Sequence, residues 1–278
     1  MRHAVPLQTG LEPFPGHRLR RLLGYGSFAE VWEAEAEDGT IHALKFLPAE
    51  RQDDATPCEL RSLQAIRQLQ HPNLLRIDRV WCHLGYIVIA MERADGSLAD
   101  LHATYRTEAG SAVMPEYACL LLSQAAAALD FLNARRHLIE GQAVAFQHCD
   151  VKPSNLMLFG ETVKLADFGL AVMMTGPVVL HRPSGTPEYA APEVFRGRLT
   201  RHSDQFSLAV TYCELRGGRL PFPKAPRTFH SDYFHPPPDL SMLLPEERPI
   251  VARALAIGAE ERWPTCAEFI DRLARLFI

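Results

Sequence analysis

The sequence lacks any apolar run long enough to cross a membrane. Its most apolar stretch, residues 117–132, is interrupted by Ser123, Gln124 and Asp130, which predicts a buried helix and no membrane insertion. The first 16 residues carry prolines where a secretory signal needs an apolar centre, so we expect no signal peptide.

Neither sign of charge is in large excess. The 278 residues include 29 Lys and Arg against 33 Asp and Glu, a net charge of −4, whereas a nucleic-acid-binding protein would normally show a strong basic surplus. Internal repeats and low-complexity segments are absent as well. With 47% hydrophobic and 22% charged residues, the composition is that of a globular protein that needs neither a disulfide nor a metal to fold.

Closely spaced metal ligands are also missing. The six cysteines lie at least 24 residues apart and the twelve histidines are scattered, so neither a zinc site nor a redox pair is indicated. Dispersed cysteines are typical of reduced thiols. We therefore expect a cytoplasmic protein that binds no nucleic acid.

Two patterns of hydrophobic residues divide the chain. Up to Met91, short apolar segments bounded by turns predict five strands and one helix, whose apolar residues recur every three positions from Leu60 to Leu69. The strands are expected at residues 18–25, 29–36, 41–47, 74–81 and 86–91.

Beyond residue 96, helical periodicity dominates. Helices are expected at residues 115–132, around residues 206–214, and at residues 246–257 and 265–277. Ser203 is the predicted N-cap of the second of these, and Gly217-Gly218 its stop. Residues 221–249 contain eight prolines, which excludes a long regular helix there.

The first candidate functional motif is a glycine-rich turn from Gly24 to Ala29. Glycines let backbone N–H groups approach phosphate oxygens closely, but a plain hairpin turn is the alternative, and Ala29 stands where a third glycine would strengthen the pattern. Lys45 lies inside an apolar strand. It is either a solvent-facing lysine or an ammonium directed at phosphates and held by Glu59 from the nearby helix.

A more specific motif follows in the second half. Asp150, Lys152 and Asn155 lie within six residues of a loop that also contains Pro153, and Asp167-Phe168-Gly169 begins twelve residues after Asn155. Asn155 and Asp167 carry the hard oxygen ligands that Mg²⁺ accepts. Asp150 could accept a hydroxyl proton, and Lys152 could neutralise charge on a transferred group.

Together with the segment Gly185–Glu193, these motifs resemble the eukaryotic-type protein kinase family, and the sequence is similar to bacterial eukaryote-like serine/threonine kinases. The resemblance runs from about residue 17 to the C-terminus. It implies an α+β, bilobal protein-kinase-like fold: an N-terminal extension (1–16), an N-lobe with a five-stranded antiparallel sheet and one main helix (17–94), and a larger, mostly helical C-lobe (95–278).

The resemblance also implies a role for each matching residue. Lys45 would contact the α- and β-phosphates of ATP and pair with Glu59. Asp150 would orient and deprotonate the acceptor hydroxyl, assisted by Lys152, while Asn155 and Asp167 would hold Mg²⁺, with Mn²⁺ as a substitute. The remaining nucleotide-binding residues would be Gly24, Gly26, Val31, Ala43, Met91, Glu92, Ala94 and Met157, although Val31, Ala43 and Met157 are also ordinary core residues. Two structural contacts are implied besides: an ion pair of Glu193 with Arg262, and Asp204 bracing the catalytic loop.

Three features depart from the family pattern. The distance from Glu59 to His71 is about three residues longer than usual, which would place Ser62 at the glutamate position; we favour Glu59 because one extra helical turn restores the same face. Cys149 replaces the arginine that normally binds a phosphorylated activation loop, which suggests activity without that phosphorylation. Residues 221–249 replace a helix and loop, and form either loop packing or a surface for a protein partner.

The function we expect is transfer of the γ-phosphoryl group of ATP to Ser or Thr hydroxyls of protein substrates. One alternative is a pseudokinase that acts as a nucleotide-binding scaffold or regulatory module. A small-molecule kinase is a second alternative, against which Gly185–Glu193 argues, because protein kinases lay an extended peptide along this segment.

Overall fold

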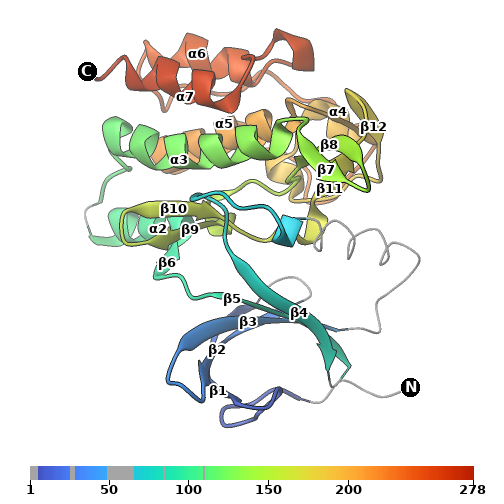
Figure 1. Ribbon diagram of the computed structural model, residues 1–278. Coiled ribbons are helices and arrows are strands. Elements are labelled where there is room, and N and C mark those ends of the chain that lie inside the picture. Colours follow the sequence, from blue (N-terminus) through green and yellow to red (C-terminus); the bar gives the residue numbers. More distant parts are fainter. Residues whose placement is uncertain (1–5, 26–28, 49–65, 84, 109) are drawn as a thin grey trace. The chain divides into compact units, whose positions relative to one another are not determined.

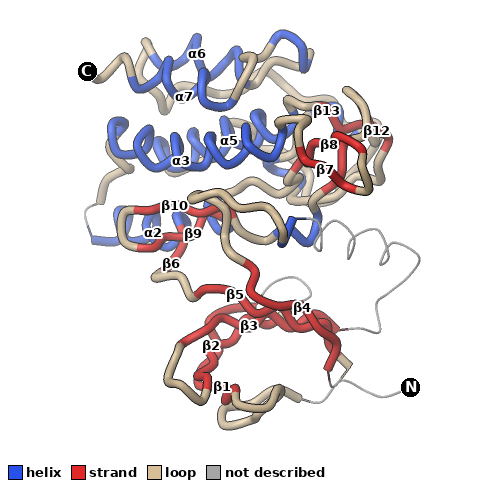
Figure 2. Tube along the Cα trace, in the orientation of Figure 1, coloured by secondary structure: helices blue, strands red, loops and turns tan. Residues whose placement is uncertain are grey.

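The chain divides into two compact units in the computed structural model shown in Figure 1, and Figure 2 shows how strands and helices are distributed between them. Residues 6–25, 29–48, 66–83, 85–108 and 110–278 are described. Unit 1 comprises residues 1–70 and 75–95, and unit 2 comprises residues 71–74 and 96–278.

Unit 1 is built on one antiparallel sheet with the spatial order β1-β2-β3-β5-β4. Its strands are β1 (His17–Tyr25), β2 (Glu30–Ala36), β3 (Ile41–Pro48), β4 (Ile77–His83) and β5 (Tyr86–Glu92). The predicted five-stranded antiparallel sheet is therefore confirmed. The predicted helix between β3 and β4 falls largely on residues 49–65, outside the described residues.

The fourth strand begins at Ile77, three residues later than predicted. The reason is that residues 71–74 belong to unit 2, where the Asn73 carbonyl accepts a hydrogen bond from Leu165 N at 2.8 Å and Leu74 bridges Leu165. Leu74 therefore belongs to unit 2, whereas the strand that follows it belongs to unit 1.

Strand alternation gives the sheet two different faces. Side chains directly opposite one another on neighbouring strands share a face. Trp32 pairs with Leu44, and Leu44 with Ala90; these side chains belong to a buried cluster with Leu19, Phe46 and Val88. The N-terminal residues Leu7 and Leu11 pack against this cluster. The segment before β1 therefore covers the face of the sheet that carries Trp32 and Leu44, and these residues do not cover the opposite face.

Unit 2 contains six helices within its described residues: α2 (Leu98–Glu108), α3 (Pro115–Asn133), α4 (Pro192–Phe195), α5 (Ser203–Gly217), α6 (Glu247–Ala254) and α7 (Cys266–Ala274). Short strands accompany them: β6 (Gly96–Ser97), β7 (His137–Ile139), β8 (Gln142–Gln147), β9 (Leu156–Phe159), β10 (Thr162–Leu165), β11 (Val172–Met174), β12 (Val178–Leu180) and β13 (Arg198–Thr200). Within unit 2, α3 lies between α7 and the β9–β10 hairpin (Figure 1). Both faces of α3 are therefore apolar, and nine of its residues are buried.

The ends of α5 show one correction. Ser203, the predicted N-cap, is the first helical residue, and His202 occupies the cap position without a side-chain cap bond. The Ser203 hydroxyl instead accepts from Thr200 N at 3.0 Å and donates to Glu193 Oε1 at 2.9 Å. The predicted stop is confirmed: Gly218 caps α5 with a left-handed φ of 65°, a conformation that costs glycine little.

The proline-rich stretch carries no helix from residue 219 to residue 246, as its composition predicts. Pro249 falls in the first turn of α6, where a missing N–H costs nothing. Helices α6 and α7 are each shorter than the predicted ranges. No helix of the described residues is long and apolar enough to span a membrane.

Candidate active site

A buried carboxylate on α5, that of Asp204, holds the loop that follows β8. Asp204 of α5 accepts hydrogen bonds from the backbone N–H groups of His148 at 2.6 Å and Cys149 at 2.9 Å, so the predicted brace is confirmed. Burial raises the pKa of Asp204, and these bonds oppose the rise. His148, fully buried, adds a second tie through Nε2 to the Ala166 carbonyl at 2.8 Å, which links this loop to the segment that carries Asp167.

Asp150 is the centre of a polar network in this loop. It is 9% exposed. Its Oδ1 accepts from the Thr186 hydroxyl at 2.7 Å, and its Oδ2 lies 2.9 Å from Lys152 Nζ. Lys152 Nζ also donates to the Thr186 hydroxyl at 2.7 Å. A carboxylate, an ammonium and a hydroxyl thus meet at one point, and the hydroxyl comes from the segment predicted to hold a peptide.

Asn155 and Asp167 present the oxygen donors that a magnesium site needs. Asn155 Nδ2 donates to the Asp150 carbonyl at 2.8 Å and to Asp150 Oδ2 at 2.9 Å. Because both acceptors are oxygens, the amide nitrogen is committed to them and its Oδ1 remains available for a metal. Asp167 has a left-handed φ of 63°, a strained conformation that surrounding structure must hold. The donor set of these two residues fits Mg²⁺.

Two protein donors are an ordinary number for magnesium. Mg²⁺ is commonly held by one or two protein oxygen ligands, and water and substrate phosphates complete its six ligands. In the described part of the chain, no group of three or more His, Cys, Asp or Glu side chains is placed to hold a metal ion.

Four of the predicted nucleotide-binding residues of unit 1 share a sheet face. Val31 lies opposite Lys45, and Ala43 lies opposite Met91; since Ala43 and Lys45 are two positions apart on β3, all four side chains point to the face opposite the buried Trp32 cluster. Gly24 pairs with Val31 at the end of β1. Sheet geometry thus groups residues that are distant in sequence.

The other predicted residues are placed as follows. Glu92 ends β5 and Ala94 follows it, both half-buried, and Met157 lies half-buried on β9 in unit 2. Gly26, Glu59 and Ser62 lie outside the described residues, so the choice between Glu59 and Ser62 as the partner of Lys45 stays a prediction.

The segment Gly185–Glu193 is anchored along its length. Gly185 has a φ of +100° and lies so close to the backbone of Cys149 that an added Cβ would be 2.2 Å from the Cys149 carbonyl oxygen. Tyr189 donates its hydroxyl to Glu214, and its carbonyl accepts from the Ser207 hydroxyl at 2.9 Å. Neither contact had a signal in the sequence, because both depend on where α5 passes beneath the segment.

The predicted pair of Glu193 and Arg262 is confirmed. Arg262, whose side chain is fully buried, donates from Nη1 and Nη2 to the two carboxylate oxygens, each at 2.8 Å. Burial raises the pKa of Glu193, but the hydrogen bonds and charge of Arg262 outweigh it and hold the pKa below its ordinary value. This pair fixes the end of the segment to the C-terminal part of unit 2.

Cys149 lies where the family resemblance leads one to expect an arginine. Burial raises the pKa of its thiol well above the ordinary value, so the thiol stays protonated and unreactive at neutral pH. The activation segment, which we define as residues 167–193, is held by strand pairing and by one side chain: β11 pairs with β8, β12 pairs with β13, and Arg135 Nη2 donates to the Thr175 carbonyl at 2.7 Å.

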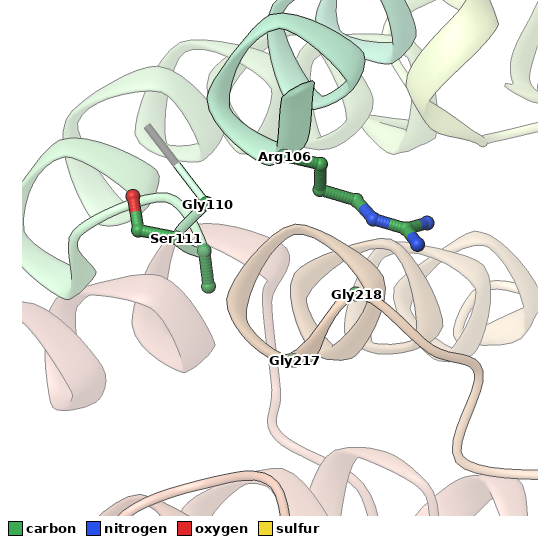
Figure 3. A pocket seen from close by; sticks show the side chains of 6 residues that line it. Arg106, Gly110, Ser111, Gly217 and Gly218 are labelled. Carbon is green, nitrogen blue, oxygen red and sulfur yellow. The ribbon is translucent and has the colours of Figure 1, made fainter. Parts of the chain in front are cut away.

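A separate hollow of about 200 Å³ lies where the end of α2, the segment before α3 and the end of α5 meet (Figure 3). Arg106, Ser111 and Gly218 are among its lining residues. The Arg106 side chain extends past the end of α5, and the Ser111 hydroxyl points away from the Arg106 side chain. This hollow therefore holds no converging polar set and includes none of the predicted site residues.

Comparison with known proteins gives consistent results. The family profile described as "Protein kinase domain" matches residues 17–263. CBL-interacting protein kinase 4 of Oryza sativa subsp. japonica is 37% identical over 225 residues, covering 76% of this chain and 46% of the relative. Serine/threonine-protein kinase PknF of Mycobacterium tuberculosis is 30% identical, covering 97% of this chain and 58% of the relative. The chain thus spans about half the length of these relatives.

A solved structure supports the same fold. The kinase domain of Mycobacterium tuberculosis PknI superimposes with a TM-score of 0.75 at 26% identity, covering 97% of this chain and 99% of that one. The predicted α+β kinase fold is confirmed by this match.

Proposed function

The chain belongs to the protein kinase family, and from that premise we propose that it transfers the γ-phosphoryl group of ATP to Ser or Thr hydroxyls of a protein substrate. The observation that carries the proposal is the meeting of Asp150, Lys152 and the Thr186 hydroxyl, with Asn155 bonded to the same carboxylate. Phosphoryl transfer needs a carboxylate that orients the acceptor hydroxyl and a cation that compensates the charge of the transferred group.

In this proposal Asp150 accepts the proton of the substrate hydroxyl. Its Oδ1 accepts a hydroxyl hydrogen bond from Thr186, and the same geometry for a substrate hydroxyl supports this role. Lys152 lies 2.9 Å from the same carboxylate and would move its ammonium toward the γ-phosphate. Asp204 braces the two backbone N–H groups that precede Asp150, so the base would be positioned before the substrate binds.

Mg²⁺ is the metal we assign to Asn155 Oδ1 and the Asp167 carboxylate, with Mn²⁺ as a substitute. When bound, such an ion neutralises charge on the nucleotide phosphates. On unit 1, Lys45 is assigned to the α- and β-phosphates, and the sheet face of Val31 and Ala43 to the adenine ring. Glu59 remains the proposed partner of Lys45.

None of the described residues favours a pseudokinase, because Lys45, Asp150, Asn155 and Asp167 are all retained.

The five described cysteines form no disulfide; they are Cys82, Cys119, Cys149, Cys213 and Cys266. That observation supports the proposed cytoplasmic location.

Incubation of the chain with labelled ATP·Mg²⁺ and a generic basic protein tests the proposal. We expect label on Ser or Thr, located by mass spectrometry, and its loss when a chelator removes Mg²⁺. Asp167→Asn should lower the transfer rate by about 100-fold or more, since removal of one well-placed electrostatic group commonly has that effect. Label that is independent of divalent metal, or that appears on Tyr alone, would overturn the proposed chemistry.

A further inference from the structure

The proline-rich stretch, residues 221–249, supplies one buried polar group that the proposed function does not use. His235 is 5% exposed. Its Nε2 lies 3.2 Å from the carbonyl oxygen of Ala190, a residue of the segment Gly185–Glu193. Since a carbonyl only accepts, His235 must carry its proton on Nε2 and donate it to Ala190.

The imidazole ring is fixed by aromatic neighbours. Phe195, Phe206 and Phe222 stand at 81°, 88° and 89° to the ring, with centroids at 5.2, 5.5 and 5.2 Å, and Tyr233 contacts it at 4.7 Å. Edge-to-face contacts on several sides hold the plane of the ring. In this position Nε2 faces the Ala190 carbonyl oxygen.

An apolar side chain would fill this space without a polar cost. The imidazole instead leaves its buried Nδ1 without a hydrogen-bond partner, and buried polar atoms of this kind are normally satisfied. Protonation of Nδ1 would bury a charge, and burial accordingly lowers the pKa of His235 to about 4. The ring therefore acts as a neutral donor, and its single hydrogen bond is the one to Ala190 in the segment Gly185–Glu193, which we call the docking segment.

His235 complements a second anchor on the neighbouring residue. The Ser207 hydroxyl of α5 donates to the Tyr189 carbonyl at 2.9 Å. Consecutive carbonyls, those of Tyr189 and Ala190, are thus each held by a side chain from a different element. The donor from α5 lies on a helix, whereas the donor from the proline-rich stretch lies in a part of the chain that is neither helix nor strand.

We propose that His235 is a positioning residue for the protein substrate: through Ala190 it holds the segment on which the peptide lies, and the proline-rich stretch serves as the support. This inference rests on the proposed function. It assigns His235 to the binding of the acceptor peptide and not to ATP binding or to the transfer step.

Steady-state kinetics on a short peptide copied from the mapped phosphorylation site tests this role. His235→Phe keeps an aromatic ring and removes the donor. We expect the KM for the peptide to rise by about tenfold or more, equivalent to about 1.4 kcal/mol, while the KM for ATP and the slow hydrolysis of ATP without peptide stay within about twofold. His235→Gln places an amide nitrogen the same number of bonds from Cβ and should restore most of the peptide affinity.

Tyr233→Phe is the matched control. The Tyr233 hydroxyl is buried without a partner and its ring touches His235, so its loss should leave both KM values unchanged. If His235→Phe does not fold, His235→Met replaces it, because the flexible thioether fills irregular space without a donor.

An unchanged peptide KM in a folded donor-free variant would overturn the inference. So would a parallel loss of ATP hydrolysis and of both affinities, which marks a purely structural role, or an equal defect in His235→Phe and His235→Gln. A wild type that transfers no phosphate would instead overturn the proposed function on which the inference rests.

Discussion

Removal of the buried Arg262 charge should destabilise unit 2 strongly and in a pH-dependent way. Arg262 donates four hydrogen bonds: two to Glu193 at 2.8 Å, and one each to the carbonyls of His202 and Ala256 at 3.0 Å. In Arg262→Met, the carboxylate of Glu193 keeps the Ser203 hydroxyl at 2.9 Å but loses its cation. Breaking a buried pair on one side costs about 3–5 kcal/mol.

For a domain of this size, about 1 kcal/mol shifts the unfolding midpoint by about 2–4 °C, so Arg262→Met should lower Tm by about 6–20 °C. Thermal unfolding followed by circular dichroism measures this. Arg275→Met is the matched control: Arg275 pairs with Asp271, and their side chains are 67% and 51% exposed. An exposed pair contributes about 0–1 kcal/mol, so this variant should shift Tm only slightly.

The pH dependence separates charge from packing. In the wild type the pKa of Glu193 is held below its ordinary value of 4.5, so its contribution to stability is present above that value and is lost as the pH falls through the lowered pKa. Without Arg262, burial, the largest influence on Glu193, is opposed only by the weaker remaining hydrogen bonds and should raise the pKa; the folded variant then binds a proton more readily than the unfolded chain. The difference between variant and wild type should therefore shrink as the pH falls from 7 toward 4.5.

Two results would refute this reasoning. One is a Tm for Arg262→Met no lower than that of Arg275→Met. The other is a difference from wild type that stays constant between pH 7 and pH 5. The double variant Glu193→Gln with Arg262→Met adds a further check, because removal of the stranded charge should recover part of the loss.

The remaining predictions concern the activation and docking segments. Thr175→Ala and Ser184→Ala, at two hydroxyl residues of the activation segment, should each keep at least about half of the wild-type transfer rate, because Cys149 replaces the arginine that would bind a phosphate there. An inactive variant, together with a wild type whose activity requires phosphate at the same position, would contradict this. Gly185→Ala should lower the transfer rate by about tenfold or more or prevent folding, because its Cβ would lie 2.2 Å from the Cys149 carbonyl oxygen. Gly141→Ala, at a φ of +78° with nothing within 4 Å, should cost only about 1–2 kcal/mol, and equal effects of the two substitutions on activity would be contrary to expectation.

The sheet and the long helices were predictable because their signals are local. Short apolar segments bounded by turns mark β3 and β5, and three- and four-residue spacing marks α3. The predicted start of β4 was three residues too early, because Leu74 belongs to unit 2. The local sequence shows that Leu74 is apolar but not to which unit it belongs. Ser203 was misplaced by one residue because its hydroxyl binds Thr200 N and Glu193 instead of capping α5.

The site divides in the same way. Asp150, Lys152 and Asn155 lie within one loop, so their grouping followed from the sequence. The contacts of Ser207 with Tyr189 and of His235 with Ala190 join residues 18 and 45 positions apart, and a single histidine in a proline-rich stretch carries no motif. Such contacts depend on tertiary packing and require the structure.

The central claim is that Asp150 serves the transfer step and not the binding of nucleotide. Measurement of phosphoryl transfer and of ATP binding on wild type and Asp150→Asn tests it most directly. Asn is nearly isosteric but cannot take the hydroxyl proton, so we expect the transfer rate to fall by about 100-fold or more and the affinity for ATP to stay within about threefold. Transfer by Asp150→Asn at a rate close to wild type would contradict the account.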